Sequence, residues 1–225
     1  MDWLREAAFE SVNVDLICGL PLQTPERFDA TLALVQELRP ERITMLENAN
    51  RQLTSHGYDA IGMDHYALSG DGLALAAREG RLHRNVQGYT SGGELELLGV
   101  GPTAISQFTH LTCQNERTLK AWSAAVAAGR PPVERGLEVW DPEALERREL
   151  NKEVMCHAPV TLDLTRFSQE WCDLRPLAAD GLVELGQRDA RGTMTVTTEG
   201  RWLIRTIAAV FDPQQRQRAS GSRLI

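Results

Sequence analysis

The sequence predicts an α/β protein in two parts, with parallel β/α units in residues 1–130 and a smaller, mainly helical domain in residues 131–225. Two observations support this. The first part alternates β-branched apolar runs with helix-like segments, which is the pattern of parallel βα units. In the second part, helices precede a β-hairpin and a final helix, an order that resembles a winged helix. We place the boundary at Pro131-Pro132 because paired prolines interrupt both kinds of element.

The first unit begins with an apolar strand at residues 12–18, which Gly19-Leu20-Pro21 ends. Thr24-Pro25-Glu26 then has the order of an N-cap, an N1 proline and an acidic first turn. An apolar stripe at helical spacing follows and consists of Phe28, Leu32, Val35 and Leu38. Pro40 ends this helix. Further strands are expected at residues 58–63 and 95–100.

The later elements are mostly helical. Helices are expected at residues 115–128, from Asp141-Pro142 onward, and at residues 164–171, 174–180 and 200–210. Two strands, at residues 181–185 and 194–197, flank a turn at residues 186–192. The charged run at residues 143–152 is typical of a solvated helix face.

The composition narrows the function classes. The chain has 225 residues, 42% hydrophobic and 24% charged, with a net charge of −7, which argues against broad binding to nucleic acid or anionic membranes. No run approaches the ~18 apolar residues of a membrane span, and the N-terminus lacks a signal pattern. We therefore expect a cytoplasmic location. Winged-helix DNA binding is disfavoured because the helix before the hairpin carries Arg175 as its one basic residue; the basic tail of Arg216, Arg218 and Arg223 is short.

The cysteines give no metal or disulfide pattern. Cys18, Cys113, Cys156 and Cys172 are widely spaced, and no CxxC occurs. Structural zinc normally requires a close ligand pair, and Cys156-His157 is adjacent rather than spaced. We expect isolated thiols and no metal site.

Three stretches carry more polar chemistry than a scaffold requires. Asp15 lies within an apolar strand, where a carboxylate needs partners: either ligand hydroxyl or amino groups, or a structural arginine or backbone amide. The stretch at residues 61–66 reads as a strand followed by Asp64, His65 and a tyrosine, which suits a site at a strand's carboxyl end or a simple loop hydrogen bond. The stretch at residues 83–90 contains Arg84, which can clamp a carboxylate in bidentate fashion, and Gln87.

These stretches resemble the coproporphyrinogen oxidase branch of the radical S-adenosylmethionine enzymes, the oxygen-independent coproporphyrinogen III oxidases (dehydrogenases). The similar segments, in family order, are residues 13–24, 61–67, 83–90, 97–106, 180–183 and 197–201. The second and third are the branch's most distinctive segments, which the related haem-chaperone branch does not normally carry. The resemblance covers nearly the whole chain.

The resemblance implies a partial (β/α) barrel that binds S-adenosylmethionine beside a 4Fe-4S cluster, in an oxidoreductase of porphyrin and haem biosynthesis. In that family a 5′-deoxyadenosyl radical abstracts hydrogen from propionate side chains of coproporphyrinogen III, and decarboxylation then leads to protoporphyrinogen IX. By position, Asp15 would contact S-adenosylmethionine, Ile105 would pack against it, and Gln87 would lie at a second such molecule or at the substrate. Arg84 and His65 are candidate substrate contacts. Val86 stands where the family usually has phenylalanine.

The chain also departs from the family. The CxxxCxxC motif that ligates the cluster is absent, and the family segment between Ile43 and Leu53 is missing. A barrel without its first strands leaves an unpaired edge and an uncovered apolar face. We therefore expect no turnover by this chain alone. The chain should be marginally stable on its own, aggregate, or need a partner that completes the sheet, as a piece of a disrupted or mis-started gene or as one half of a two-chain enzyme. The alternative is a non-catalytic porphyrin- or haem-binding or partner-binding module, with His65 and His83 as candidate axial ligands.

Overall fold

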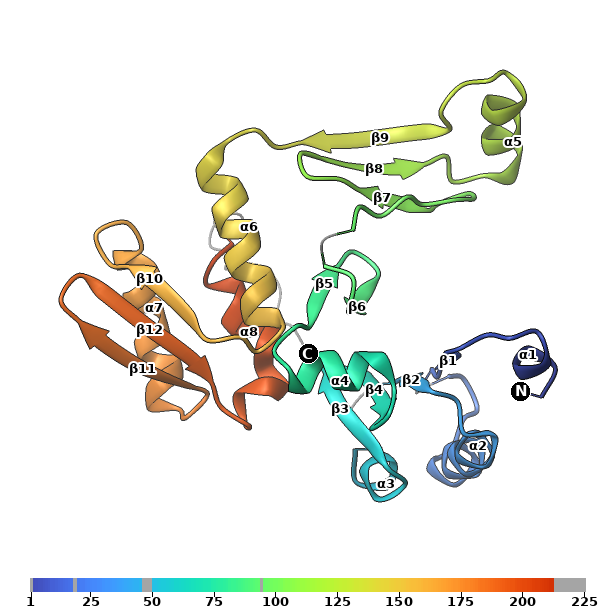
Figure 1. Cartoon of the computed structure of the whole chain (residues 1–225), viewed down its shortest axis with the longest axis horizontal. Coiled ribbons are helices and arrows are strands. Elements are labelled where there is room, and N and C mark those ends of the chain that lie inside the picture. The colour runs from blue at the N-terminus through green and yellow to red at the C-terminus, as the bar shows by residue number, and fades with distance from the viewer. Residues whose placement is uncertain (1, 18–19, 46–49, 94, 213–225) are drawn as a thin grey trace.

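In the computed structural model, which describes residues 2–17, 20–45, 50–93 and 95–212, the chain is a mixed α/β protein (Figure 1). Its described strands form sheets of four, three, three and two strands. The four-stranded sheet and its helices lie at one end of the molecule, and the C-terminal sheet lies at the other (Figure 1).

The N-terminal sheet has the strand order β1-β2-β4-β3. Its strands are β1 (Asn13–Asp15), β2 (Arg42–Thr44), β3 (Tyr58–Gly62) and β4 (His65–Leu68). The accompanying helices are α1 (Asp2–Glu6), α2 (Pro25–Leu38), α3 (Asn50–Ser55) and α4 (Gly72–Arg78). Strands β1 and β2 are parallel, whereas β4 pairs antiparallel with both β2 and β3.

Helix α2 confirms the cap predicted from the sequence. The Thr24 hydroxyl accepts a hydrogen bond from the Arg27 backbone amide at 3.3 Å, and Arg39 ends the helix in the left-handed region. Leu32 and Val35 of the predicted stripe are buried, while Leu38 is exposed. The stripe packs on a core that also contains Ile43, Met45, Leu53, Tyr58 and Tyr66.

The expected series of parallel β/α units is only partly present. The described residues form no closed barrel, and among the described strand pairs β1–β2 is the parallel one. The predicted strand at residues 58–63 is confirmed as β3, but His65 and Tyr66 begin the return strand of a hairpin rather than following a strand's carboxyl end. Met63, with φ of 50°, makes the turn. The strand predicted at residues 95–100 is wrong, because this segment forms an isolated bridge between Leu97 and Gln107.

The middle of the chain forms a hairpin and a three-stranded arm. The hairpin consists of β5 (His83–Asn85) and β6 (Gly88–Thr90), and the arm of β7 (Ile105–Gln107), β8 (Leu111–Asn115), α5 (Leu119–Ala127) and β9 (Val133–Glu138). The helix expected from residue 115 begins later, because Thr118 caps α5 and the preceding residues pair as β8. Strand β9 follows Pro131-Pro132 directly and pairs with β8, so the two-domain division at that point stays a proposal.

The C-terminal part surrounds a second core. Its elements are α6 (Pro142–Met155), β10 (Val160–Asp163), α7 (Ser168–Ala179), β11 (Val183–Arg188), β12 (Arg191–Val196), the 3-10 helix η1 (Gly200–Leu203) and α8 (Ile204–Ala209). The predicted start of α6 at Asp141, the hairpin and the final helix are confirmed. The two short helices expected at residues 164–180 are wrong: residues 168–179 form one helix despite Pro176, and β10 precedes it. The winged-helix likeness stays a prediction.

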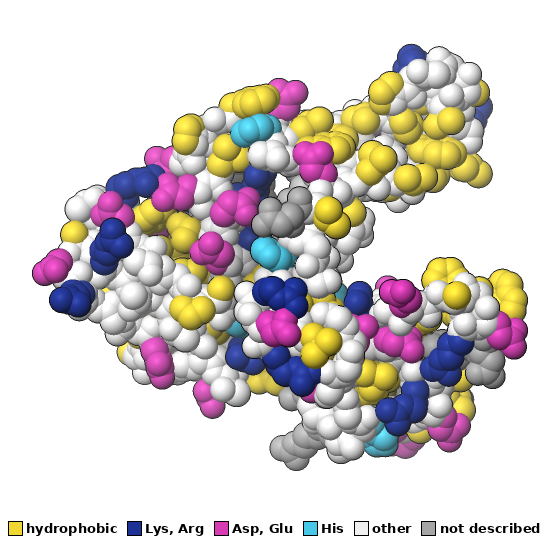
Figure 2. Space-filling view, viewed as in Figure 1, with side chains coloured by type: hydrophobic (Ala, Val, Ile, Leu, Met, Phe, Trp, Pro, Cys, Tyr) yellow, Lys and Arg dark blue, Asp and Glu magenta, His cyan; other side chains and the backbone are white. Residues whose placement is uncertain are grey.

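Figure 2 shows a hollow between the β7–β9 arm and the N-terminal sheet, with hydrophobic side chains gathered on the arm. Exposed apolar side chains of this region include Leu98, Val100, Leu119, Val126 and Leu137. No helix within the described residues is long and apolar enough to cross a membrane.

Candidate functional site

Two of the polar stretches singled out from the sequence meet around one aromatic ring. Tyr89, on β6, is buried, and the His65 ring of β4 lies edge-on to it with 5.2 Å between ring centroids. On the same ring lies the Arg84 guanidinium of β5, 4.7 Å from the ring centroid. The structure therefore brings His65 and Arg84, the two candidate substrate contacts, together through Tyr89.

Two glycines allow this close packing. A Cβ on Gly62 would lie 2.5 Å from the Tyr89 hydroxyl, and one on Gly88 would lie 2.8 Å from His65 Nε2. Gly88 also has φ of 145°, a conformation that side chains rarely adopt. The β3–β4 turn and the β5–β6 hairpin can thus touch because both strands carry glycine at the contact.

The charges of this cluster are set by its neighbours. His65 Nδ1 donates to Asp64 Oδ1 at 2.8 Å, and this hydrogen bond lowers the pKa of Asp64. Burial raises the pKa of Tyr89 to about 12, so its hydroxyl stays protonated at neutral pH. Burial likewise raises the pKa of the neighbouring Cys156 thiol to about 11, which leaves it a poor nucleophile.

The cluster is attached to the C-terminal part through the end of α6. The Tyr89 hydroxyl donates a buried hydrogen bond of 2.8 Å to the Met155 carbonyl oxygen. His157, two residues further on, packs so close that a Cβ on Gly62 would lie 3.0 Å from its Cε1. Burial, and secondarily the charge of Arg201, lowers the pKa of His157 to about 4, and its buried Nε2 has no hydrogen-bond partner among the described residues.

We expect the packing of His157 against the β3–β4 turn to be sensitive to acid. The folded-state pKa of His157 lies below the unfolded value of 6.5, so its contribution to stability is complete above pH 6.5 and is lost as pH falls towards 4. For a half-buried group we expect a loss of about 2 kcal/mol. In His157→Asn, which suits the residue's φ of 62°, this component is absent. Urea unfolding at pH 7 and pH 4.5 measures the free energy of unfolding of both proteins. The difference between wild type and variant should shrink by about 2 kcal/mol at the lower pH. An equal difference at both pH values would contradict this.

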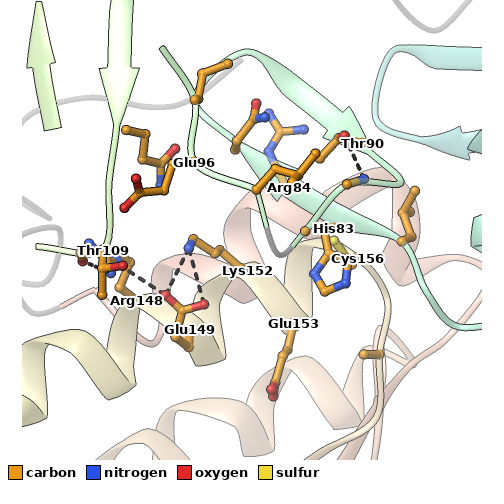
Figure 3. A pocket seen from close by; sticks show the side chains of 18 of the residues that line it. His83, Arg84, Thr90, Glu96, Thr109, Arg148, Glu149, Lys152, Glu153 and Cys156 are labelled. Atoms are coloured by element: carbon orange, nitrogen blue, oxygen red, sulfur yellow. Dashed lines mark hydrogen bonds and ion pairs between the residues drawn. The ribbon is translucent and has the colours of Figure 1, made fainter. Parts of the chain in front are cut away.

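A cavity of about 570 Å³ adjoins the cluster (Figure 3), a size typical of small-molecule sites. One wall is the β5–β6 hairpin, which contributes His83 and Arg84, and the opposite wall is α6, which contributes Arg148, Glu149 and Lys152. The sequence had led us to expect a solvated face for this part of α6. The spacing of four residues between Arg148 and Lys152, which places both on one side of a helix, was the available signal.

The three predicted S-adenosylmethionine contacts lie on different sheets. Asp15 is exposed at the end of β1, where its Oδ1 accepts a hydrogen bond of 2.6 Å from Asn13. Gln87 is exposed in the β5–β6 turn, and Ile105 lies in β7. The turn and β7 are joined because the Val86 amide donates to Gln107 Oε1 at 3.0 Å. The β5–β6 turn that carries Gln87 is thus hydrogen-bonded to the strand that carries Ile105. Asp15, in contrast, lies on β1, the edge strand of the four-stranded sheet.

The described residues do not fit an iron–sulfur cluster. Cys113 is buried in β8, Cys156 follows α6 and Cys172 is exposed on α7, while Cys18 lies outside the described residues. No group of three or more histidine, cysteine or acidic residues in the described part of the chain could hold a metal ion. Three thiolates at cluster spacing would be needed.

Comparison with known proteins identifies the fold and then the family. No family model matches the chain. Among solved structures, it is similar to coproporphyrinogen III oxidase (HemN) from Escherichia coli, a radical SAM enzyme, with a TM-score of 0.80 and 36% identity over 95% of this chain and 57% of that one. The chain therefore has the fold of part of a radical SAM enzyme.

The curated relatives narrow the assignment. The oxygen-independent coproporphyrinogen III oxidase of Thermostichus vulcanus is 39% identical over 97% of this chain and 78% of its own length. The proteins of that name from Synechocystis and Escherichia coli are 38% and 36% identical, and the chain spans 54% and 55% of them. The chain belongs to the oxygen-independent coproporphyrinogen III oxidase family.

The alignments also show what the chain lacks. The match to the Thermostichus protein runs over 260 residues, although this chain has 225. That relative therefore carries residues within the matched stretch that have no counterpart here. The missing segment expected between Ile43 and Leu53 stays a prediction.

Proposed function

We propose that this chain forms the later part of an oxygen-independent coproporphyrinogen III oxidase, which converts coproporphyrinogen III to protoporphyrinogen IX by oxidative decarboxylation with S-adenosylmethionine and a 4Fe-4S cluster. The observation that carries the proposal is 39% identity over nearly the whole chain to a protein of that name. The juxtaposition of His65, Arg84 and Tyr89 supports it from the structure.

In this proposal two groups of residues have separate tasks. Asp15 on β1, with Gln87 and Ile105 around the β5–β6 turn and β7, contacts S-adenosylmethionine. Arg84 and His65 contact the substrate: the Arg84 guanidinium supplies a fixed, planar donor for a propionate carboxylate. The Asp64 carboxylate orients the His65 ring through Nδ1, and Nε2 lies beside Gly88, where a Cβ would be 2.8 Å from it.

We also propose that catalysis needs barrel strands and cluster ligands that the described residues do not supply. The cluster ligands are not among the described residues, and β1 is the outer strand of its sheet in the described fold. The exposed apolar side chains on the β7–β9 arm, beside the hollow in Figure 2, support a further segment or a partner chain that completes the barrel. Turnover by the purified chain with iron, sulfide and S-adenosylmethionine would contradict this part of the proposal.

The test of the S-adenosylmethionine site is isothermal titration of the folded chain. We expect measurable binding by the wild-type chain and at least about ten-fold weaker binding by Asp15→Ala, because a ligand hydrogen bond to a charged group contributes about 1.5–3 kcal/mol. Asp29→Ala, an exposed carboxylate on α2, is the matched control and should bind like the wild type.

The outcomes separate two situations. Binding that Asp15→Ala loses and Asp29→Ala keeps supports a preformed S-adenosylmethionine half-site on this chain. No heat of binding from a chain shown to be folded by circular dichroism would contradict the proposed cofactor contact.

The second candidate is a non-catalytic porphyrin-binding module. It is favoured by the cavity beside His83 and Arg84 together with the unsuitable cysteine positions. A chain that binds coproporphyrin III but not S-adenosylmethionine would select this candidate over the first.

A further inference from the structure

The α6 wall of the cavity carries a carboxylate held by two cations. Glu149 Oε1 accepts from Lys152 Nζ at 2.9 Å and from Arg148 Nε at 3.3 Å, and its Oε2 lies 3.2 Å from the same Lys152 nitrogen. Figure 3 shows these three side chains together at one side of the cavity. Arg148 and Lys152 thus form a binding position for one carboxylate, and the side chain of Glu149 occupies it.

The cations are the fixed members of this group. Arg148 Nη2 donates to the Thr109 carbonyl oxygen at 2.7 Å, which ties α6 to the loop between β7 and β8. The side chains of Arg148 and Lys152 are 27% and 30% exposed, whereas that of Glu149 is 53% exposed. Because exposed ion pairs contribute little to stability, an incoming carboxylate can replace Glu149 while both cations keep their places.

The opposite wall adds a third positive charge. Arg84 lines the same cavity from β5, and its described contact is with the Tyr89 ring rather than with an acidic side chain. A ligand that bears two or more carboxylates can therefore contact cations on both walls. A ligand with none would bury Arg148 and Lys152 without gaining an anion.

We propose that Lys152 and Arg148 form a binding position for a carboxylate of the ligand, and that Glu149 fills this position when the ligand is absent. The ligand class is a small organic polycarboxylate. If the proposed function holds, the carboxylate is a propionate arm of the porphyrinogen, and helix α6 supplies substrate contacts in addition to those of Arg84 and His65.

The experiment exploits the opposite signs expected for neighbouring residues. Coproporphyrin III is titrated by fluorescence quenching and glutarate by NMR at low ionic strength, where charge effects are least screened. Lys152→Gln should weaken binding about ten-fold through the lost charge-assisted bond, while Glu149→Gln should strengthen it several-fold because the competing carboxylate is gone. A role in folding alone would not make Glu149→Gln bind more tightly.

Matched controls remove general charge effects. Lys120→Gln changes the charge on α5, away from the cavity. Glu146→Gln changes it on α6 itself, at a carboxylate paired with Arg166 outside the cavity lining. The inference is overturned if Glu149→Gln binds no tighter than Glu146→Gln, if Lys152→Gln binds no more weakly than Lys120→Gln, or if neither probe binds.

The two probes also separate this inference from the proposed function. Glutarate binding with the expected pattern, but no binding of coproporphyrin III, would support the carboxylate position and count against the porphyrinogen as substrate. Coproporphyrin III binding that is indifferent to Lys152 and Glu149 would support the proposed substrate and overturn the position on α6.

Discussion

Replacing Tyr89 with alanine is expected to lower the free energy of unfolding by about 3–5 kcal/mol, the usual cost of truncating a buried aromatic side chain. The ring is 7% exposed and contacts His65 and Arg84, and its hydroxyl reaches the Met155 carbonyl. One substitution thus removes the contact between the β5–β6 hairpin, the β3–β4 turn and the end of α6. Urea denaturation followed by circular dichroism measures the loss.

Tyr89→Phe is the matched control. It keeps the ring and removes the hydroxyl, so we expect a loss of about 1 kcal/mol from the single hydrogen bond to Met155. The His65 ring protons supply a local readout, because a neighbouring aromatic face shifts their NMR signals. That shift should persist in the phenylalanine variant and disappear in the alanine variant. An alanine variant no less stable than the phenylalanine variant would show that the ring does not organise the cluster.

The elements that the sequence predicted well are those whose signal is local. Helices α2 and α6 are capped by Thr24 and Asp141 as predicted, because a polar cap followed by proline needs no distant partner. The β11–β12 hairpin was likewise visible from two short runs around a turn, and its strands are longer than expected.

The elements that were missed depend on distant pairing. All six residues of β9 are exposed, so it has no alternating apolar pattern, and its extended form is set by its register with β8. The β3–β4 turn places Met63 at positive φ, and a methionine in the sequence gives no indication of this conformation. The reversed direction of His65 and Tyr66 follows from that turn, which explains why parallel units were expected where a hairpin occurs.

The candidate site shows the same division. Arg84 and His65 were found from unusual local composition, but their meeting place, the Tyr89 ring, depends on glycines at positions 62 and 88 that belong to different hairpins. The α6 wall was interpreted as a solvated face, because the sequence does not reveal that the β5–β6 hairpin lies opposite it. The four-residue spacing of Arg148 and Lys152 therefore indicates a binding site only when the β5–β6 hairpin is known to lie opposite α6.

Removing the Glu170 carboxylate is expected to be about as damaging as removing the Tyr89 ring. Glu170 on α7 is 1% exposed and forms an ion pair with Arg147 of α6, whose guanidinium also lies 5.1 Å from the Phe167 ring centroid. In Glu170→Ala the guanidinium stays partly buried without its closest anion. Breaking a buried pair from one side costs about 3–5 kcal/mol, which urea denaturation should detect as a lower midpoint at unchanged slope.

The same arginine supplies its own control. Arg147 Nη2 also contacts Glu143 at 2.9 Å, but that carboxylate is 58% exposed, so Glu143→Ala should cost less than about 1 kcal/mol. The double variant Arg147→Leu/Glu170→Leu should be more stable than Glu170→Ala, because replacing both charges with apolar groups leaves no unpaired ion in the buried contact, and Glu143, which loses its partner, is exposed. Equal losses for Glu143→Ala and Glu170→Ala would show that burial does not set the strength of this pair. If Glu170→Ala costs more than Glu143→Ala, the buried Arg147–Glu170 pair is what fixes α6 against α7. Helix α6 also carries Lys152, so the same contact would hold the proposed carboxylate position in place.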